Sequence, residues 1–268
     1  MSHTILYTSD VHGNQEQLEH LLQHAQQITP YAMVIAGEIA PKGVLDPDPE
    51  IYLARQKAFV KHDLHRFALQ CKEVLPEMQL FIGLGNDDAG VVLPILEQHE
   101  QEGLFHVLNK RHALTPDKDI VGYFYVPITP FQIKDWEKYD LSTPSEGQKE
   151  AYEYLKSTNY CFEGVKSSKL GWSEFSFTPH LEQRDSIQKD LEKELYTKNA
   201  TNTLYVFHAP PYNTVLDMLH TREHVGSLAV RAFIENYHPL ATLHGHIHET
   251  VDMSGKYQTT LVTSVCMS

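Results

Sequence analysis

Five short motifs along the chain carry side chains that can bind a divalent metal ion, and each follows a predicted strand. They are Asp10-Val11-His12, Gly37-Glu38, Gly85-Asn86-Asp87-Asp88, His208 and Gly245-His246-Ile247-His248. Imidazole nitrogen, carboxylate oxygen and amide oxygen together suit borderline or hard divalent ions such as Mn, Fe, Zn, Ni or Mg. The motifs therefore predict a metal site that does not depend on thiolates.

Two ions in such a site would make it a binding place for one phosphate group. A pair of metals needs a bridging carboxylate, and two divalent ions with the carboxylates of Asp10 and Glu38 leave a charge of about +2. The whole chain is acidic, with 22 Lys and Arg against 35 Asp and Glu and a net charge of -13. A chain with this charge balance lacks the overall basic character that binding of duplex nucleic acid requires. We expect a small substrate, such as a nucleotide or a phosphorylated metabolite.

The elements that must position these motifs alternate between strands and helices. Apolar, β-rich runs predict strands over residues 4–9, 31–36 and 79–82. Apolar side chains at helical spacing predict helices over residues 15–25, 51–75 and 92–97, the second as one long helix or two. Residues 37–49, with a DPDP stretch, are predicted to form a loop. This alternation predicts an α/β layered fold whose strand ends converge on one edge of a sheet.

The same order returns near the C-terminus. The predicted elements are a strand over 203–207, a helix over 226–237, a strand over 240–243 and hairpin strands on either side of Ser254-Gly255-Lys256. Two prolines force a loop after His208, because proline cannot continue a strand. Gly13 and Gly245 are expected to permit the bends that turn the paired motifs toward one centre.

A single domain over residues 1–268 is expected, with one irregular segment. Residues 104–127 are predicted to form several short strands, and the pattern weakens from about 128 to 200, where polar and aromatic residues are mixed. A charged helix is predicted near 181–196. We interpret 128–200 as an insertion or lid that frames the leaving group.

Composition favours a cytoplasmic protein without a membrane span. The longest apolar stretches are a handful of residues, and residues 1–4 lack a basic stretch and a long apolar run. Three widely spaced cysteines without a CxxC pattern argue against a disulfide framework or a structural zinc cluster. The sequence leaves a homo-oligomer open.

The five motifs, in this order, resemble those of the calcineurin-like metallophosphoesterases, whose pattern is D-x-H, G-D, G-N-H-D, H and G-H-x-H. Residues 208–212, 224–227 and 245–249 look most like a small prokaryotic branch, the Icc-related predicted phosphoesterases. The resemblance spans about residues 4–265, except for 128–200. It implies a four-layer α/β/β/α fold, a β-sandwich flanked by helices. It also implies hydrolysis of phosphomonoesters or phosphodiesters by a hydroxide that bridges two divalent metal ions.

Carried over residue by residue, the resemblance implies two sets of ligands that share one carboxylate. One ion would be held by Asp10, His12, Glu38 and His248, and the other by Glu38, Asn86, His208 and His246. Asn86 would also contact the substrate. Glu38 stands where the family usually has aspartate, and the added methylene moves the carboxylate by roughly a bond length. Bridging therefore depends on the position of the backbone at Glu38.

Asp87 stands where many family members have the histidine that protonates the leaving group. Nearby cations lower the pKa of an aspartate, so Asp87 is expected to be a poor general acid. Leaving groups that need no protonation, such as aryl phosphates, would then react best. His224 is our candidate for a substitute acid or a phosphate contact. The Asn-Pro-Gly sequence near the end of family members is also missing, so one wall of the site is expected to differ.

Each motif alone has a simpler explanation. Asp10 with His12 could cap the following helix, Glu38 could be an exposed loop residue, and Asn86 could be a turn residue. His244 is expected to pack or to form hydrogen bonds rather than to bind metal. The alternative function is a catalytically weak or inactive member of the same fold that acts as a binding or scaffold protein. Asp87 in place of histidine keeps this alternative open, whereas the other seven positions favour the enzyme, because clustered buried polar groups are costly to keep.

Overall fold

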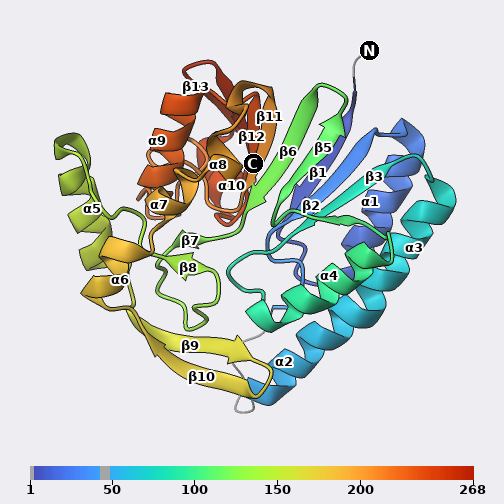
Figure 1. Cartoon of the computed structure of the whole chain (residues 1–268), viewed down its shortest axis with the longest axis horizontal. Helices are drawn as coiled ribbons and strands as arrows, with labels where there is room; N and C mark the ends of the chain where they lie inside the picture. The colour runs from blue at the N-terminus through green and yellow to red at the C-terminus, as the bar shows by residue number, and fades with distance from the viewer. Residues whose placement is uncertain (1–2, 43–48) are drawn as a thin grey trace.

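The computed structural model describes residues 3–42 and 49–268, and two β-sheets lie at its centre with helices on both sides (Figure 1). The DPDP part of the predicted loop, up to Asp48, lies outside the described residues. The first sheet is parallel throughout and contains, in order, β1 (Ile5–Ser9), β2 (Ala32–Ala36), β3 (Gln79–Gly83) and β4 (His106–Val107). The first three strands confirm the predicted ones.

The second sheet is mixed and has the order β13-β14-β12-β11-β6-β5. Its strands are β5 (Arg111–Thr115), β6 (Lys118–Tyr123), β11 (Thr203–Phe207), β12 (Ala241–Leu243), β13 (Gln258–Leu261) and β14 (Ser264–Met267). The inner pairs β6–β11, β11–β12 and β12–β14 are parallel, and the edge strands β5 and β13 are antiparallel to their neighbours. Parallel inner strands send their carboxyl ends to one edge.

Alternate residues of β11 face different cores, which makes the architecture four-layered. Leu204 and Val206 belong to the core that also contains the first sheet, whereas Tyr205 and Phe207 belong to a second core. The first core is covered by α1 (Gln15–Ile28), α3 (His65–Val74) and α4 (Leu93–Gln101), and the second by α7 (Ile187–Leu191) and α9 (Leu228–Tyr237). The predicted α/β fold class is confirmed.

The helices around the first sheet explain two of the sequence patterns. The side chain of Asn14 accepts a hydrogen bond from the Gln17 N–H and caps α1, which frees Asp10 and His12 from that role. The long helical pattern of 51–75 is one continuous run. It consists of α2 (Pro49–Ala58), a π-helical turn (Phe59–Leu64) and α3.

The segment 128–200 combines short strands and helices. Its elements, with the strand that leads into it, are β7 (Val126–Pro127), β8 (Glu137–Lys138), α5 (Glu146–Thr158), β9 (Glu163–Ser168), β10 (Gly171–Ser176), α6 (Pro179–Arg184), α7 and α8 (Glu194–Thr197). Tyr152 and Leu155 of α5 pack in the second core, and so do Ile187, Leu191 and Tyr196. Much of the segment therefore contacts the main body, and the boundaries of an insertion stay a prediction.

Two predicted elements near the C-terminal half are wrong. The charged helix over 181–196 is three short helices, because Asp185 leaves helical geometry and Ser186 caps α7 through its bond from the Lys189 N–H. The turn at Gly255 does not join two strands. Gly255 instead ends α10 (Thr250–Ser254) in a left-handed conformation, which is a common role of glycine at helix C-termini. The hairpin of β13 and β14 turns later, at Val262 and Thr263.

None of the helices in the described part of the chain is both long and apolar enough to cross a membrane.

Candidate metal centre

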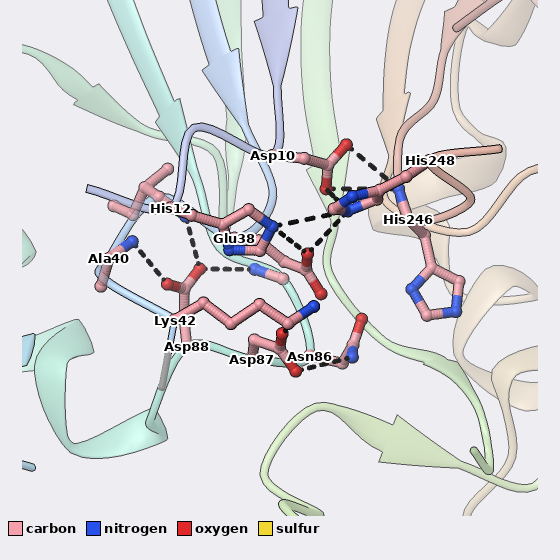
Figure 2. Close-up of polar contacts among 12 residues, drawn as sticks. Asp10, His12, Glu38, Ala40, Lys42, Asn86, Asp87, Asp88, His246 and His248 are labelled. Atoms are coloured by element: carbon pink, nitrogen blue, oxygen red, sulfur yellow. Dashed lines mark hydrogen bonds and ion pairs between the residues drawn. The ribbon is translucent and has the colours of Figure 1, made fainter. Parts of the chain in front are cut away.

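The seven predicted ligands follow the carboxyl ends of five parallel strands, three from the first sheet and two from the second. Asp10 and His12 follow β1, Glu38 follows β2, Asn86 follows β3, His208 follows β11, and His246 and His248 follow β12. These loops meet at one edge of the two sheets, where the labelled side chains gather (Figure 2). Residues distant in the sequence thus share a single site.

Glu38 lies between two groups of histidines, and each of its oxygens faces one group. Its Oε2 lies 3.0 Å from Nε2 of His12 and 3.3 Å from Nε2 of His248, and its Oε1 lies 3.8 Å from Nε2 of His208. Two groups of potential ligand atoms within 4.8 Å of one another share Glu38. One group adds His12 and His248, and the other adds His208 and His246. The carboxylate of Glu38 is therefore common to both groups.

Asp10 and Asn86 lie beside these two groups. Oδ1 of Asp10 lies 3.9 Å from Nε2 of His248, and both Asp10 oxygens accept the backbone N–H of His246 at 3.3 Å. Oδ1 of Asn86 lies 3.0 Å from Nε2 of His208. The predicted ligands form one cluster, with the same division into two sets that the resemblance implies.

Four of these residues have a backbone conformation that residues with side chains rarely adopt. The φ angle is 56° at Asp10, 49° at His12, 47° at Glu38 and 73° at His246. Such conformations cost roughly 1–3 kcal/mol each and persist where the surrounding structure holds them. Here the N–H of Asp10 donates to Gly37 O at 3.0 Å, and that of His12 donates to Glu38 O at 2.8 Å. The first two loops therefore hold each other in these bends.

Gly13 and Gly245 serve different purposes. Gly13 has a φ of 70° and makes the predicted bend. The prediction for Gly245 is wrong, because the left-handed residue there is His246. A Cβ at Gly245 would lie 2.6 Å from Oδ2 of Asp10, so glycine is required for the close approach of that carboxylate.

The cluster concentrates opposing charges in a buried space. Burial raises the pKa of Asp10, and the neighbouring Glu38 charge adds to this, while His208 acts against it. Burial alone would also raise the pKa of Glu38, but hydrogen bonds from three histidines outweigh burial and hold this pKa well below its ordinary value. Glu38 is therefore ionised at neutral pH, the form that binds metal.

The donor atoms fit a pair of divalent ions. Nε2 of His12 and Nε2 of His248 lie 3.4 Å apart and both face Glu38. Within the described residues, Nδ1 of His246 is buried without a hydrogen-bond partner. Burial lowers the pKa of His246 to about 3, so its ring is neutral. Neutral imidazoles, carboxylates and an amide oxygen are suitable ligands for such ions.

Asp87 contacts a cation that the sequence analysis missed. Nζ of Lys42 lies 2.9 Å from Oδ2 of Asp87, and Nδ2 of Asn86 donates to Oδ1 of Asp87 at 3.4 Å. Lys42 lies four residues after Glu38 in the same predicted loop. Its place near Glu38 in the sequence could have marked Lys42 as a candidate site residue. Its contact with Asp87, however, depends on how two distant loops fold together.

Asp88 joins the loops after β2 and β3. Its carboxylate accepts backbone N–H groups from Ile39 at 3.1 Å, Ala40 at 2.8 Å and Gly85 at 2.8 Å. Burial raises the pKa of Asp88 to about 7, although these three bonds act to lower it. Asp88 thereby positions Glu38 relative to Asn86, a role that its place in the motif did not indicate.

His224 lies in the loop before α9 and is held by a buried carboxylate. Its Nδ1 lies 2.7 Å from Oδ1 of Asp217, which also accepts backbone N–H groups from Asn213, Thr214 and Gly226. Within the described chain, no hydrogen bond, ion pair or ring contact joins His224 to the seven predicted ligands. Its catalytic role stays a prediction.

His244 packs as expected. It is fully buried, and its ring nitrogens lie 2.8 Å from the Thr242 hydroxyl and 3.0 Å from the Ala209 carbonyl. Burial lowers the pKa of His244 to about 4, which keeps the ring neutral beside the cluster.

An apolar cavity of about 180 Å³ lies against the second group of ligands. His246 and Ile247 form part of its wall. The remaining wall comes from the 127–131 stretch, from the end of α5 and from the loop that carries His224, and it includes Ile128, Phe131, Tyr160, Leu219 and Val225. The cavity therefore begins at a predicted metal ligand and extends away from the charged cluster.

Comparisons with solved structures agree with this fold. The protein TT1561 of Thermus thermophilus aligns with 100% of this chain and 88% of its own, with a TM-score of 0.53 and 14% identity. A dimetal phosphatase from Danio rerio, LOC 393393, aligns with 99% of this chain and 86% of its own, with a TM-score of 0.52 and 11% identity. At these identities the likeness concerns the fold.

The sequence itself defines the family. The model of the calcineurin-like phosphoesterases matches residues 3–250, and the chain belongs to this family, which uses divalent metal ions. Over 69 residues the chain is 39% identical to the uncharacterized protein MJ1162 of Methanocaldococcus jannaschii. That match covers 22% of this chain and only 32% of the relative.

Proposed function

We propose that the protein hydrolyses small phosphoesters with two divalent metal ions, drawn from Mn, Fe, Zn, Ni and Mg, held around Glu38. The observation that carries this proposal is that the two oxygens of Glu38 face two separate histidine groups. One carboxylate shared by two sets of ligands is the arrangement that a two-metal site requires. Membership of a phosphoesterase family supports the reaction class.

Two bound ions would lower the pKa of a shared water and neutralise phosphoryl oxygens. The side chains supply a fixed, largely preformed set of donors, which limits the reorganisation needed when the substrate arrives. Asn86 directs its Nδ2 to Asp87 and its Oδ1 to His208, so the amide oxygen would be the atom available to a metal ion. We propose that Asn86 also contacts the substrate phosphate.

The cavity next to His246 is the proposed place of the leaving group. Its wall is mainly apolar, and its volume of about 180 Å³ exceeds that of cavities known to take up one aromatic ring. The substrate we propose is therefore a small phosphorylated molecule, such as a nucleotide, with a ring-like group attached to the phosphate. The acidic exterior disfavours duplex nucleic acid.

Proton supply to the leaving group is the weak part of this site. Asp87 is engaged with Lys42 and Asn86, so aryl phosphates, whose leaving groups need no protonation, should react faster than alkyl phosphates. His224 remains our candidate acid, since its loop also forms part of the cavity wall. Full turnover of an alkyl phosphate by His224→Ala would remove that candidate.

The decisive experiment is an assay of purified protein with each of the five metals. We expect turnover of p-nitrophenyl phosphate, of bis-p-nitrophenyl phosphate or of both, and its loss with a chelator. Asp10→Asn and His208→Ala should each lower turnover by at least roughly 100-fold. Even mutation of residues that only hydrogen-bond to metal ligands typically lowers metal affinity or activity by 10–100-fold. The control is His24→Ala, which changes an exposed histidine on α1 and should leave turnover intact.

The absence of turnover with every metal and both substrates would contradict the proposal. That result would favour the scaffold alternative, in which the same fold acts through its surface.

A further inference from the structure

The loop after β2 carries a lysine, Lys42, that contacts Asp87, the residue that stands where many family members have a histidine. We infer that Lys42 binds a phosphoryl oxygen of the substrate and that Asp87 positions it for this contact. This inference rests on the proposed function; it assigns a contact with the substrate phosphate to Lys42 and the positioning of that lysine to Asp87. Figure 2 shows the Lys42 side chain reaching across Asp87 toward Asn86 and the carboxylate of Glu38.

The position of Lys42 is set by more than one interaction. Its Nζ lies 2.9 Å from Oδ2 of Asp87 and 5.9 Å from the centre of the Phe131 ring, which forms part of the cavity wall. Glu38 and Asp10 add attraction at longer range. The ammonium therefore lies near the predicted metal ligands and near Phe131 of the cavity wall.

The contacts of Asp87 suit it to position the Lys42 side chain rather than to act as a general acid. Its carbonyl accepts hydrogen bonds from the Tyr52 hydroxyl at 2.7 Å and from Nε2 of Gln56 at 2.8 Å, so its backbone is fixed. Its carboxylate contacts Lys42 on one oxygen and Asn86 on the other. Asp87 thus acts as a positioning residue for one phosphate-binding cation and one metal-binding amide.

Accessibility distinguishes Lys42 from a purely structural cation. Its side chain is 51% exposed, whereas that of Asp87 is 12% exposed, so the ammonium can take a further ligand without leaving its partner. An ammonium carries three donors, and Asp87 uses one of them. Asp87 keeps its hydrogen bond from Asn86 when Lys42 is removed, so we expect the loss of the ammonium to weaken ligand binding in particular.

The test uses the metal-loaded protein and inorganic phosphate as the probe. Calorimetry should show that Lys42→Met weakens phosphate binding by roughly 10–100-fold, the range expected for loss of a hydrogen bond to a charged group. The KM for p-nitrophenyl phosphate should rise in parallel, while the metal content stays at the wild-type value. Lys42→Arg should recover most of the affinity. The matched control is Lys61→Met, at an exposed position of the π-helical turn.

A second variant separates positioning by Asp87 from acid catalysis. Asp87→Asn should weaken phosphate binding and lower turnover of aryl and alkyl phosphates to a similar degree. A loss confined to alkyl phosphates, with phosphate affinity unchanged, would mean that Asp87 is the acid and would overturn its positioning role. Unchanged phosphate affinity in Lys42→Met, or an affinity that Lys42→Arg does not recover, would overturn the role of Lys42. Both results concern only these residues, since wild-type turnover decides the proposed function separately.

Discussion

At the scale of single residues, Glu38 connects the two histidine groups of the candidate site. Its left-handed backbone and its longer side chain place the two oxygens between histidines of different loops. The longer side chain thus reaches both histidine groups from this backbone conformation.

Substitution of Glu38 tests this relation. We expect Glu38→Gln to lower bound metal, measured by elemental analysis, and to reduce turnover at least roughly 100-fold, because the amide removes the shared charge. Glu38→Asp should also lose metal, since the shorter side chain withdraws from the histidines in a backbone shaped for glutamate. Glu19→Gln, an exposed change on α1, is the control. Full metal content and turnover in Glu38→Gln would show that this residue does not bridge.

The clustering of the candidate ligands could be predicted from the sequence, whereas the contacts of their immediate neighbours could not. Asp10, His208 and His246 each lie in a short motif at the end of a strand, which predicts that they meet. Lys42 and Asp88 act through contacts between two loops separated by β3 and three helical segments, so no local pattern marks them.

At the scale of elements, a buried ion pair fixes the stretch that forms one wall of the cavity. Lys134 and Glu137 are both fully buried, with Nζ 2.8 Å from Oε2. Lys134 also donates to Thr129 O at 2.9 Å, and Glu137 accepts the Thr129 N–H at 3.0 Å. These bonds fix the shape of the turn between β7 and β8, which carries Ile128 and Phe131 of the cavity wall.

Removal of the lysine should destabilise the fold. We expect Lys134→Met to lower the free energy of unfolding by about 3–5 kcal/mol, because it leaves a buried carboxylate without its partner. Lys134→Met combined with Glu137→Leu should recover much of this loss. Denaturant titrations provide the measurement, and equal stability of Lys134→Met and the wild type would contradict the expectation.

The same variant should show a defined pH dependence. Burial raises the pKa of Glu137 to about 7 from an ordinary value of 4.5, even though Lys134 acts to lower it. A raised pKa in the folded state means that stability is full below about 4.5 and falls as pH rises through about 7. Loss of Lys134 raises this pKa further, so the deficit of Lys134→Met should be larger near about pH 8 than near about pH 5.

Strands were easier to predict than the helices and turns of 128–268. Apolar runs such as 203–207 are buried on both faces and can form little else. The prediction of one helix over 181–196 is wrong because Ile187 packs in the second core and its N–H donates to Tyr139 O. Neither contact can be predicted from charge or periodicity. The prediction of a hairpin turn at Gly255 is wrong because a left-handed glycine can also end a helix.

At the scale of the whole molecule, the site joins the two sheets. The first sheet supplies Asp10, His12, Glu38 and Asn86, and the second supplies His208, His246 and His248. Metal binding should therefore stabilise the fold. At a free metal concentration about 100 times the dissociation constant, one site adds about 2.7 kcal/mol, which raises Tm by roughly 5–10 °C in a chain of this length.

Thermal unfolding with and without a chelator measures this effect. We expect the Tm to fall when metal is removed and the metal-dependent part of Tm to disappear in Asp10→Asn. His24→Ala should keep the full shift. The same Tm in wild-type protein with and without metal would contradict a site that ties the sheets together.

The spacing of the ligands also bears on synthesis and proteolysis. The first predicted ligand is residue 10 and the last is residue 248, so a fragment that lacks either end of this interval has an incomplete set of donors. The ribosome must therefore synthesise all of residues 10–248 before the complete site can form. Bound metal would then report that this whole interval is present, and a protease cut that releases His246 and His248 should lower the metal content.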